Sequence, residues 1–267
     1  MRNVLLLIHH DRGQESRYQA ALDVTRAIGG HLTCVDLTMI PEFVGDYVGA
    51  TGAILADEQA DEAANKTRML ARLQREDVSF DWIDRTGFTA QTIRDHGGLS
   101  DLVVLSCSGG GQMSEQMSVA IGDTLLQVGK PVLAVPMNAP RFNLCGRALV
   151  AWDGSDDAEA ALQAAAPLLS KAETVTIYHN EDGSLRIPPD DAARYLARHG
   201  IEPIINSEPA GSRRPAEAIL AECRSGGHDW IVMGAYGRGR VIEEIFGGAT
   251  RSMLKESPVP LFLMHKR

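Results

Sequence analysis

Runs of consecutive apolar residues recur along the chain, and most are followed by a stretch whose apolar residues are spaced as on one face of a helix. The runs at residues 4–8, 102–105, 148–152 and 230–233 consist mainly of valine, leucine, isoleucine and other apolar residues. Uninterrupted runs of this kind are typical of strands buried on both faces of a parallel sheet. The alternation of such strands with helices predicts an α/β fold.

The same order of elements occurs twice. Asp101 opens an apolar run that ends in a Ser-Cys-Ser-Gly-Gly-Gly loop, and Asp229 opens one that ends in Gly-Ala-Tyr-Gly-Arg-Gly. Each copy starts with an apolar run that leads to an aspartate, Asp11 or Asp153, and finishes with a strand introduced by proline. Each copy therefore reads β-α-β-α-β-α-β-α-β, which predicts a five-stranded parallel sheet with helices on both faces. We place one domain at residues 1–137 and the other at 146–267, with the linker between them.

Local signals predict where several helices begin and end. A helix over residues 15–28 should stop at the glycine pair 29–30. Ser155 is placed to cap the first helix of the second copy, whose first turn carries Asp156, Asp157 and Glu159. The first copy is longer, and we assign most of the extra length to a longer crossover at 41–65, between the second strand and a helix that runs to about residue 75.

Charge and cysteine content narrow the functional classes. The formal net charge of −9 disfavours general binding of nucleic acid, whose backbone is also negative. The four cysteines form no CxxC pair and are expected to be buried free thiols. The N-terminal apolar run is too short for a signal peptide or a membrane span, which predicts a cytoplasmic protein without membrane contact.

The loops after the first and fourth strands of the second copy are the best candidates for a ligand site. In a doubly wound sheet these loops lie together at the carboxyl ends of the strands. The second of them, residues 234–240, is rich in glycine and arginine, and Gly247, Gly248 and Thr250 follow at the start of a helix. Glycine loops and helix N-termini offer backbone N–H groups to phosphate oxygens. The pattern is neither a Walker A loop nor the GxGxxG fingerprint.

At these residues the chain resembles the universal stress protein family. Gly234, Gly237, Gly247 and Gly248, with nine residues between the second and third, closely match the family motif G-x2-G-x9-G-[S/T]. The segment Ala-Trp-Asp-Gly-Ser at 151–155 is also similar to the family's first strand-to-helix turn. The resemblance covers almost all of the second copy and is fainter in the first, which points to the tandem members of the family.

The resemblance implies two Rossmann-like domains and an ATP site in the second one. Magnesium or manganese would accompany the nucleotide, and a role in regulating the stress response would follow. The motif's Ser/Thr position is glycine here, so one phosphate-binding hydroxyl is missing. The residues that the resemblance assigns to the nucleotide are Asp153, Asn180, Met233, Gly234, Gly237, Arg238, Gly247, Gly248, Ala249 and Thr250.

The first copy departs from the motif. Ser106 stands in place of the first motif glycine, and Val119-Ala120 stand in place of Gly247-Gly248. The side chain of Val119 would obstruct the approach of a phosphate. We therefore expect the first domain to have lost this ATP site and to serve structure, regulation or another ligand.

Other functions stay open as alternatives. No convincing catalytic set is present, so at most slow ATP hydrolysis is expected, and a nucleotidyl enzyme of related architecture is disfavoured by the position of the loop. The sequence His9-His10-Asp11 is interpreted as a polar strand end at the surface, not as a metal site. A ligand-free interaction module is the third class. In every case we expect the two halves to pair with pseudo-two-fold symmetry, and a further homodimer remains open.

Overall fold

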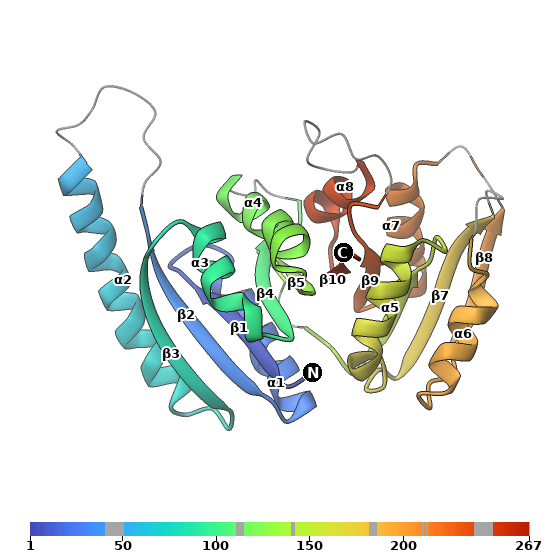
Figure 1. The fold of residues 1–267 in the computed structure, drawn as a ribbon, viewed down its shortest axis with the longest axis horizontal. Coiled ribbons are helices and arrows are strands. Elements are labelled where there is room, and N and C mark those ends of the chain that lie inside the picture. The colour runs from blue at the N-terminus through green and yellow to red at the C-terminus, as the bar shows by residue number, and fades with distance from the viewer. Residues whose placement is uncertain are drawn as a thin grey trace.

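The computed structural model describes residues 1–40, 51–110, 115–139, 142–181, 186–209, 211, 213–237 and 248–266. Strands and helices alternate through both halves of the chain (Figure 1). The first half contains β1 (Asn3–Ile8), α1 (Gln14–Ile28), β2 (His31–Met39), α2 (Thr51–Leu73), β3 (Ser79–Gly87), α3 (Thr89–His96), β4 (Leu102–Cys107), α4 (Glu115–Asp123) and β5 (Val132–Pro136). The second half contains β6 (Arg147–Ala151), α5 (Asp156–Leu169), β7 (Thr174–Glu181), α6 (Pro189–Ala197), β8 (Ile204–Pro209), α7 (Pro215–Gly226), β9 (Trp230–Gly234), α8 (Gly248–Glu256) and β10 (Leu261–Met264).

The strands form one ten-stranded sheet in the order β3-β2-β1-β4-β5-β10-β9-β6-β7-β8. Within each half all neighbouring strands run parallel, which confirms the predicted α/β fold. The two halves meet edge to edge at β5 and β10, which pair antiparallel with Leu133 opposite Phe262. Figure 1 shows this seam in the middle of the molecule.

Two apolar layers cover the two faces of the sheet, and each layer runs through both halves. Alternate residues of a strand belong to different layers. Leu6 belongs to the layer that contains residues of α1, α2, α5 and α6, and Leu5 belongs to the layer that contains residues of α3, α4, α7 and α8. This use of both faces explains why the strands read as continuous apolar runs. Within the part of the chain that the structure describes, no helix combines the length and apolar character needed to span a bilayer.

Most of the expected helix boundaries are confirmed. Gly29 ends α1 in the left-handed conformation, at a φ of 56°. The Oγ of Ser155 accepts a hydrogen bond of 3.2 Å from the N–H of Ala158 and so caps α5. The expectation that the crossover extends to residue 65 before the helix begins was wrong, because α2 begins at Thr51. Three of the four cysteines are buried as expected, but Cys145 is exposed.

An aspartate at the same place in each half binds the start of the first strand. Asp101 Oδ2 accepts hydrogen bonds from the N–H groups of Arg2 and Asn3, at 2.6 and 2.9 Å. Asp229 Oδ2 accepts one from the N–H of Arg147 at 2.7 Å. These contacts explain why each copy opens its fourth strand with aspartate, and they support the reading of the chain as a repeat.

Candidate functional site

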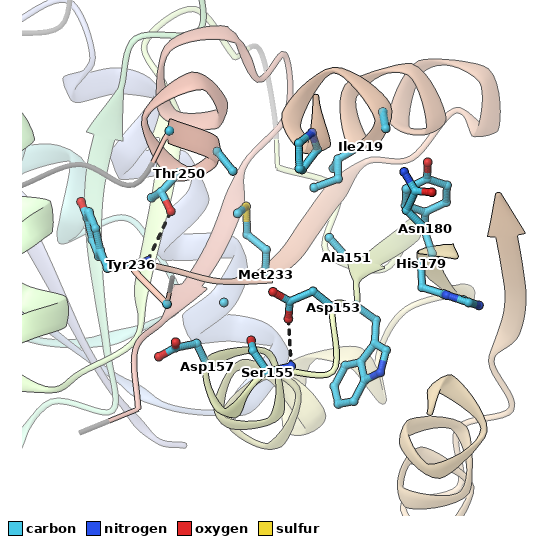
Figure 2. A pocket seen from close by; sticks show the side chains of 18 residues that line it. Ala151, Asp153, Ser155, Asp157, His179, Asn180, Ile219, Met233, Tyr236 and Thr250 are labelled. Atoms are coloured by element: carbon cyan, nitrogen blue, oxygen red, sulfur yellow. Dashed lines mark hydrogen bonds between the residues drawn. The ribbon is translucent and has the colours of Figure 1, made fainter. Parts of the chain in front are cut away.

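A cavity of about 290 Å³ opens in the second half, at the carboxyl ends of β6, β7 and β9. The strand β6 lies between β9 and β7, so the loops that follow β6 and β9 separate here and leave room for a ligand. The first turn of α5, the helix α7 and the start of α8 complete the walls (Figure 2). The lining residues are Ala151, Trp152, Asp153, Ser155, Asp157, Tyr178, His179, Asn180, Pro215, Ala218, Ile219, Met233, Gly234, Tyr236, Gly237, Gly248, Ala249 and Thr250.

The structure brings together eight of the ten residues that the sequence assigned to a nucleotide. These eight line the cavity: Asp153, Asn180, Met233, Gly234, Gly237, Gly248, Ala249 and Thr250. The other two, Arg238 and Gly247, lie outside the described residues. Segments far apart in the sequence therefore meet around one hollow, as the doubly wound topology predicts.

Asp153 is held at the mouth of the cavity by the turn after β6. Its Oδ1 accepts a hydrogen bond of 3.0 Å from the N–H of Ser155, the residue that caps α5. The carboxylate is exposed and points into the cavity in Figure 2. Asp153 can therefore accept hydrogen bonds from hydroxyl groups of a ligand.

The glycines at the end of β9 are required by the protein's own packing. A Cβ on Gly234 would lie 2.6 Å from the backbone nitrogen of Ala158, and one on Gly237 would lie 2.4 Å from Oδ2 of Asp157. Asp157 is itself fixed, because its Oδ1 lies 2.7 Å from Nδ1 of His265 and accepts the N–H of Lys266. Glycine at these positions lets the loop lie against the first turn of α5.

Gly248 has a different environment, because it opens α8 towards the cavity. A Cβ added there would meet no atom of the described residues within 4 Å. The first N–H groups of a helix have no partner within the helix and attract anions. The start of α8 therefore offers backbone donors and empty space to an anionic group of a ligand.

Tyr236 connects the loop after β9 to α8. Its backbone N–H donates a hydrogen bond of 3.4 Å to Oγ1 of Thr250, which is 4% exposed. The hydroxyl proton of Thr250 is not used in this bond and can be donated to a ligand. Tyr236 has a φ of 62°, a strained value for a residue with a side chain, and burial raises its pKa to about 12.

The opposite wall of the cavity is apolar, and of its residues only Met233 was assigned from sequence. Ile219 on α7 and Met233 on β9 both line the cavity (Figure 2), and Ala218 and Tyr178 are also among the lining residues. Tyr178 could have been found, because it lies two residues before Asn180 and shares its face of the strand. The residues of α7 carry no motif and gave no signal.

In the first half the corresponding place is filled by side chains. Arg17 is fully buried, and its guanidinium donates to Oδ1 of Asp11 at 2.9 Å and to Oγ of Ser106 at 2.6 Å. Ser106, which replaces the first motif glycine, also lies where a Cβ on Gly13 would come within 2.3 Å of its Oγ. The loops after β1 and β4 are thus tied directly to each other.

The expectation of a polar surface at the end of β1 was wrong for His9. This residue is 5% exposed, and its Nδ1 lies 2.5 Å from Oε1 of Glu62 on α2. Burial opposes ionisation of Glu62, but hydrogen bonds with His9 and the N–H of His10 outweigh it and lower the pKa of Glu62. Among the described residues no group of three His, Cys, Asp or Glu side chains is placed to hold a metal ion.

The sequence of the second half matches the model of the Universal stress protein family over residues 146–265. These residues form a universal stress protein domain. No curated protein matches the chain. The tandem architecture is found in solved structures as well, and a universal stress protein from Archaeoglobus fulgidus DSM 4304 superposes with a TM-score of 0.77 at 21% identity, covering 99% of this chain and 96% of that one.

A second solved structure extends the likeness. A protein assigned to the universal stress proteins from Pseudomonas aeruginosa UCBPP-PA14 matches with a TM-score of 0.60 at 16% identity, covering 99% of this chain and 93% of its own. At such identities the likeness establishes the fold. The universal stress protein domain is therefore the second half of a two-part fold that these structures share over their length, and the cavity described above lies within it.

Proposed function

We propose that the protein binds ATP together with Mg²⁺ or Mn²⁺ in the cavity of its universal stress protein domain, and that it acts in the cytoplasm as a regulatory protein of the stress response. One observation carries the proposal. The cavity has an apolar wall at one end and the open N-terminus of α8 at the other, which suits a flat base and a chain of phosphates.

The residues present fit this ligand. The base would lie between Met233 and Ile219, with Asn180 at its edge, and the ribose hydroxyls would reach Asp153. The phosphate oxygens would accept hydrogen bonds from the N–H groups at the start of α8. The described lining residues include Asp153 and Asp157 but no lysine or arginine, so a divalent cation is needed to neutralise the phosphate charge.

ATP titration of variants at Gly248 tests the proposal. A Cβ at Gly248 would meet no described atom within 4 Å, and a valine there would project where the phosphates would lie, so we expect ATP-Mg²⁺ to bind about tenfold more weakly. Serine at the same position restores the hydroxyl of the family motif and should strengthen binding by about threefold. The measurement is isothermal titration calorimetry, after mass spectrometry of any nucleotide released on denaturation.

Gly98→Val is the matched control, because Gly98 is exposed in the first half and its Cβ would also meet no atom within 4 Å. It should leave the affinity unchanged. A folded wild-type protein that carries no nucleotide and gives no heat with ATP-Mg²⁺ would contradict the proposal. The function would then be that of a ligand-free interaction module.

A further inference from the structure

The loop that follows β4 in the first half contacts the helix that opens onto the cavity of the second half. The N–H of Ser108 donates a hydrogen bond of 3.0 Å to the carbonyl of Leu254, and the N–H of Gly110 donates one of 2.8 Å to the carbonyl of Lys255. Both acceptors lie in the last turn of α8, where carbonyl groups have no partner within the helix. The first half therefore supplies the C-terminal cap of α8.

This loop occupies the place of the phosphate-binding loop in its own half. Ser108 and Gly110 correspond to the stretch that begins the glycine motif in the second half, and Gly109 and Gly110 have φ values of 59° and 98°. Two N–H groups of this loop are committed to α8. The loop therefore makes a contact between the two halves.

The helix α8 connects the contact with the first half to the cavity. It has nine residues, which span about 13 Å. Its last turn is bound by the first half, and its first turn, Gly248 to Thr250, lines the cavity. A displacement at one end of so short a helix moves the donors at the other end.

A second contact reaches the same wall of the cavity. A Cβ on Gly122 of α4 would lie 3.7 Å from the hydroxyl of Tyr236, so the face of α4 is adjacent to this side chain. Tyr236 lines the cavity and binds Thr250 through its backbone. The first half therefore touches the cavity wall through both the loop and α4.

We propose that residues 108–110 of the first half, together with Gly122, position α8 and Tyr236 and thereby set the nucleotide affinity of the second half. The first half, which lacks the glycine motif, thus positions residues of the ligand site in the second half. The statement about affinity rests on the proposed function, whereas the statement about α8 does not.

The variant Gly110→Ala tests the contact with a closely matched control. Gly110 and Gly29 are both exposed, both have positive φ, and neither would bring a Cβ within 4 Å of another atom. Alanine therefore strains the backbone at each position, but only Gly110 binds α8. We expect Gly110→Ala to weaken ATP binding by about five- to tenfold and Gly29→Ala to leave it unchanged.

Hydrogen exchange of α8 in the nucleotide-free protein is the second measurement. We expect the amides of α8 to exchange several-fold faster in Gly110→Ala than in Gly29→Ala. Equal exchange in the two variants would overturn the positioning role, whatever the affinity for ATP. Faster exchange in a protein that never binds ATP would uphold the contact and refute the proposed function alone.

If Gly110→Ala does not fold, Gly122→Leu replaces it. A leucine there should displace Tyr236 and speed the exchange of the amides at the start of α8. Unchanged exchange in a folded Gly122→Leu protein would likewise contradict the proposal.

Discussion

Replacing Arg17 with methionine is expected to lower the free energy of unfolding by about 3 kcal/mol, because it removes a fully buried guanidinium from its buried hydrogen-bond acceptors and from its ion pair with the partly exposed Asp11. The Arg17 side chain is fully buried in α1. Besides Asp11 and Ser106, its guanidinium donates to the carbonyls of Leu7 and His9 at 3.2 and 3.3 Å. Methionine fills a similar volume but satisfies none of these acceptors.

The matched control is Arg26→Met in the same helix. Arg26 is an exposed residue that pairs with Glu76 and Asp77, and the loss of such a surface ion pair costs less than about 1 kcal/mol. Urea denaturation followed by circular dichroism measures both variants. Arg17→Lys should also destabilise the protein, since an ammonium group cannot reach the acceptors in the planar arrangement of a guanidinium. Similar losses for Arg17→Met and Arg26→Met would show that the buried network contributes no more than a surface ion pair.

The fold could be predicted from sequence because its strongest signals are local and occur twice. Buried parallel strands such as β4 and β9 are continuous apolar runs, and the capping residues Gly29 and Ser155 act within a few positions of themselves. The repeat doubled the evidence for each element. The start of α2 was misjudged because the second copy has no counterpart for that length, although alanines and acidic residues favour a helix there.

The candidate site could be predicted only where it carries a motif. The loops after β6 and β9 bring recognisable glycines, and the topology places them together. The wall formed by Ala218 and Ile219 depends on how α7 packs, which leaves no local pattern. His9 was assigned to the surface for the same reason, since its burial depends on Glu62, a residue distant in sequence. The contact of Ser108 with Leu254 is equally nonlocal.

Replacing Asp36 with asparagine is expected to stabilise the protein, and increasingly so as the pH rises from 4 to 7. Asp36 is 6% exposed on β2, and its Oδ1 has no hydrogen-bond partner among the described residues. Burial, together with the negative charges of Glu62 and Asp84, raises the pKa of Asp36 from 3.8 to about 7. Lys66 and His9 oppose this rise only in part.

The sign follows from the proton balance between the two states. Between pH 3.8 and about 7 the folded protein keeps a proton on Asp36 that the unfolded chain has released. The stability of the wild-type protein is therefore not reduced by Asp36 below pH 3.8, and it falls as the pH rises from 3.8 to about 7. Asparagine stays neutral and avoids the loss, which amounts to at most about 4 kcal/mol when fully developed.

Urea denaturation of both proteins at several pH values measures the effect. The difference in unfolding free energy between Asp36→Asn and the wild type should be near zero at pH 4 and should reach its plateau above pH 7. The control is Asp81→Asn on the edge strand β3, where the carboxylate is exposed beside His31 and its replacement should change stability little. A constant difference for Asp36→Asn would mean that Asp36 gains no proton on folding. In that case the pKa of Asp36 would be the same in the folded and the unfolded protein.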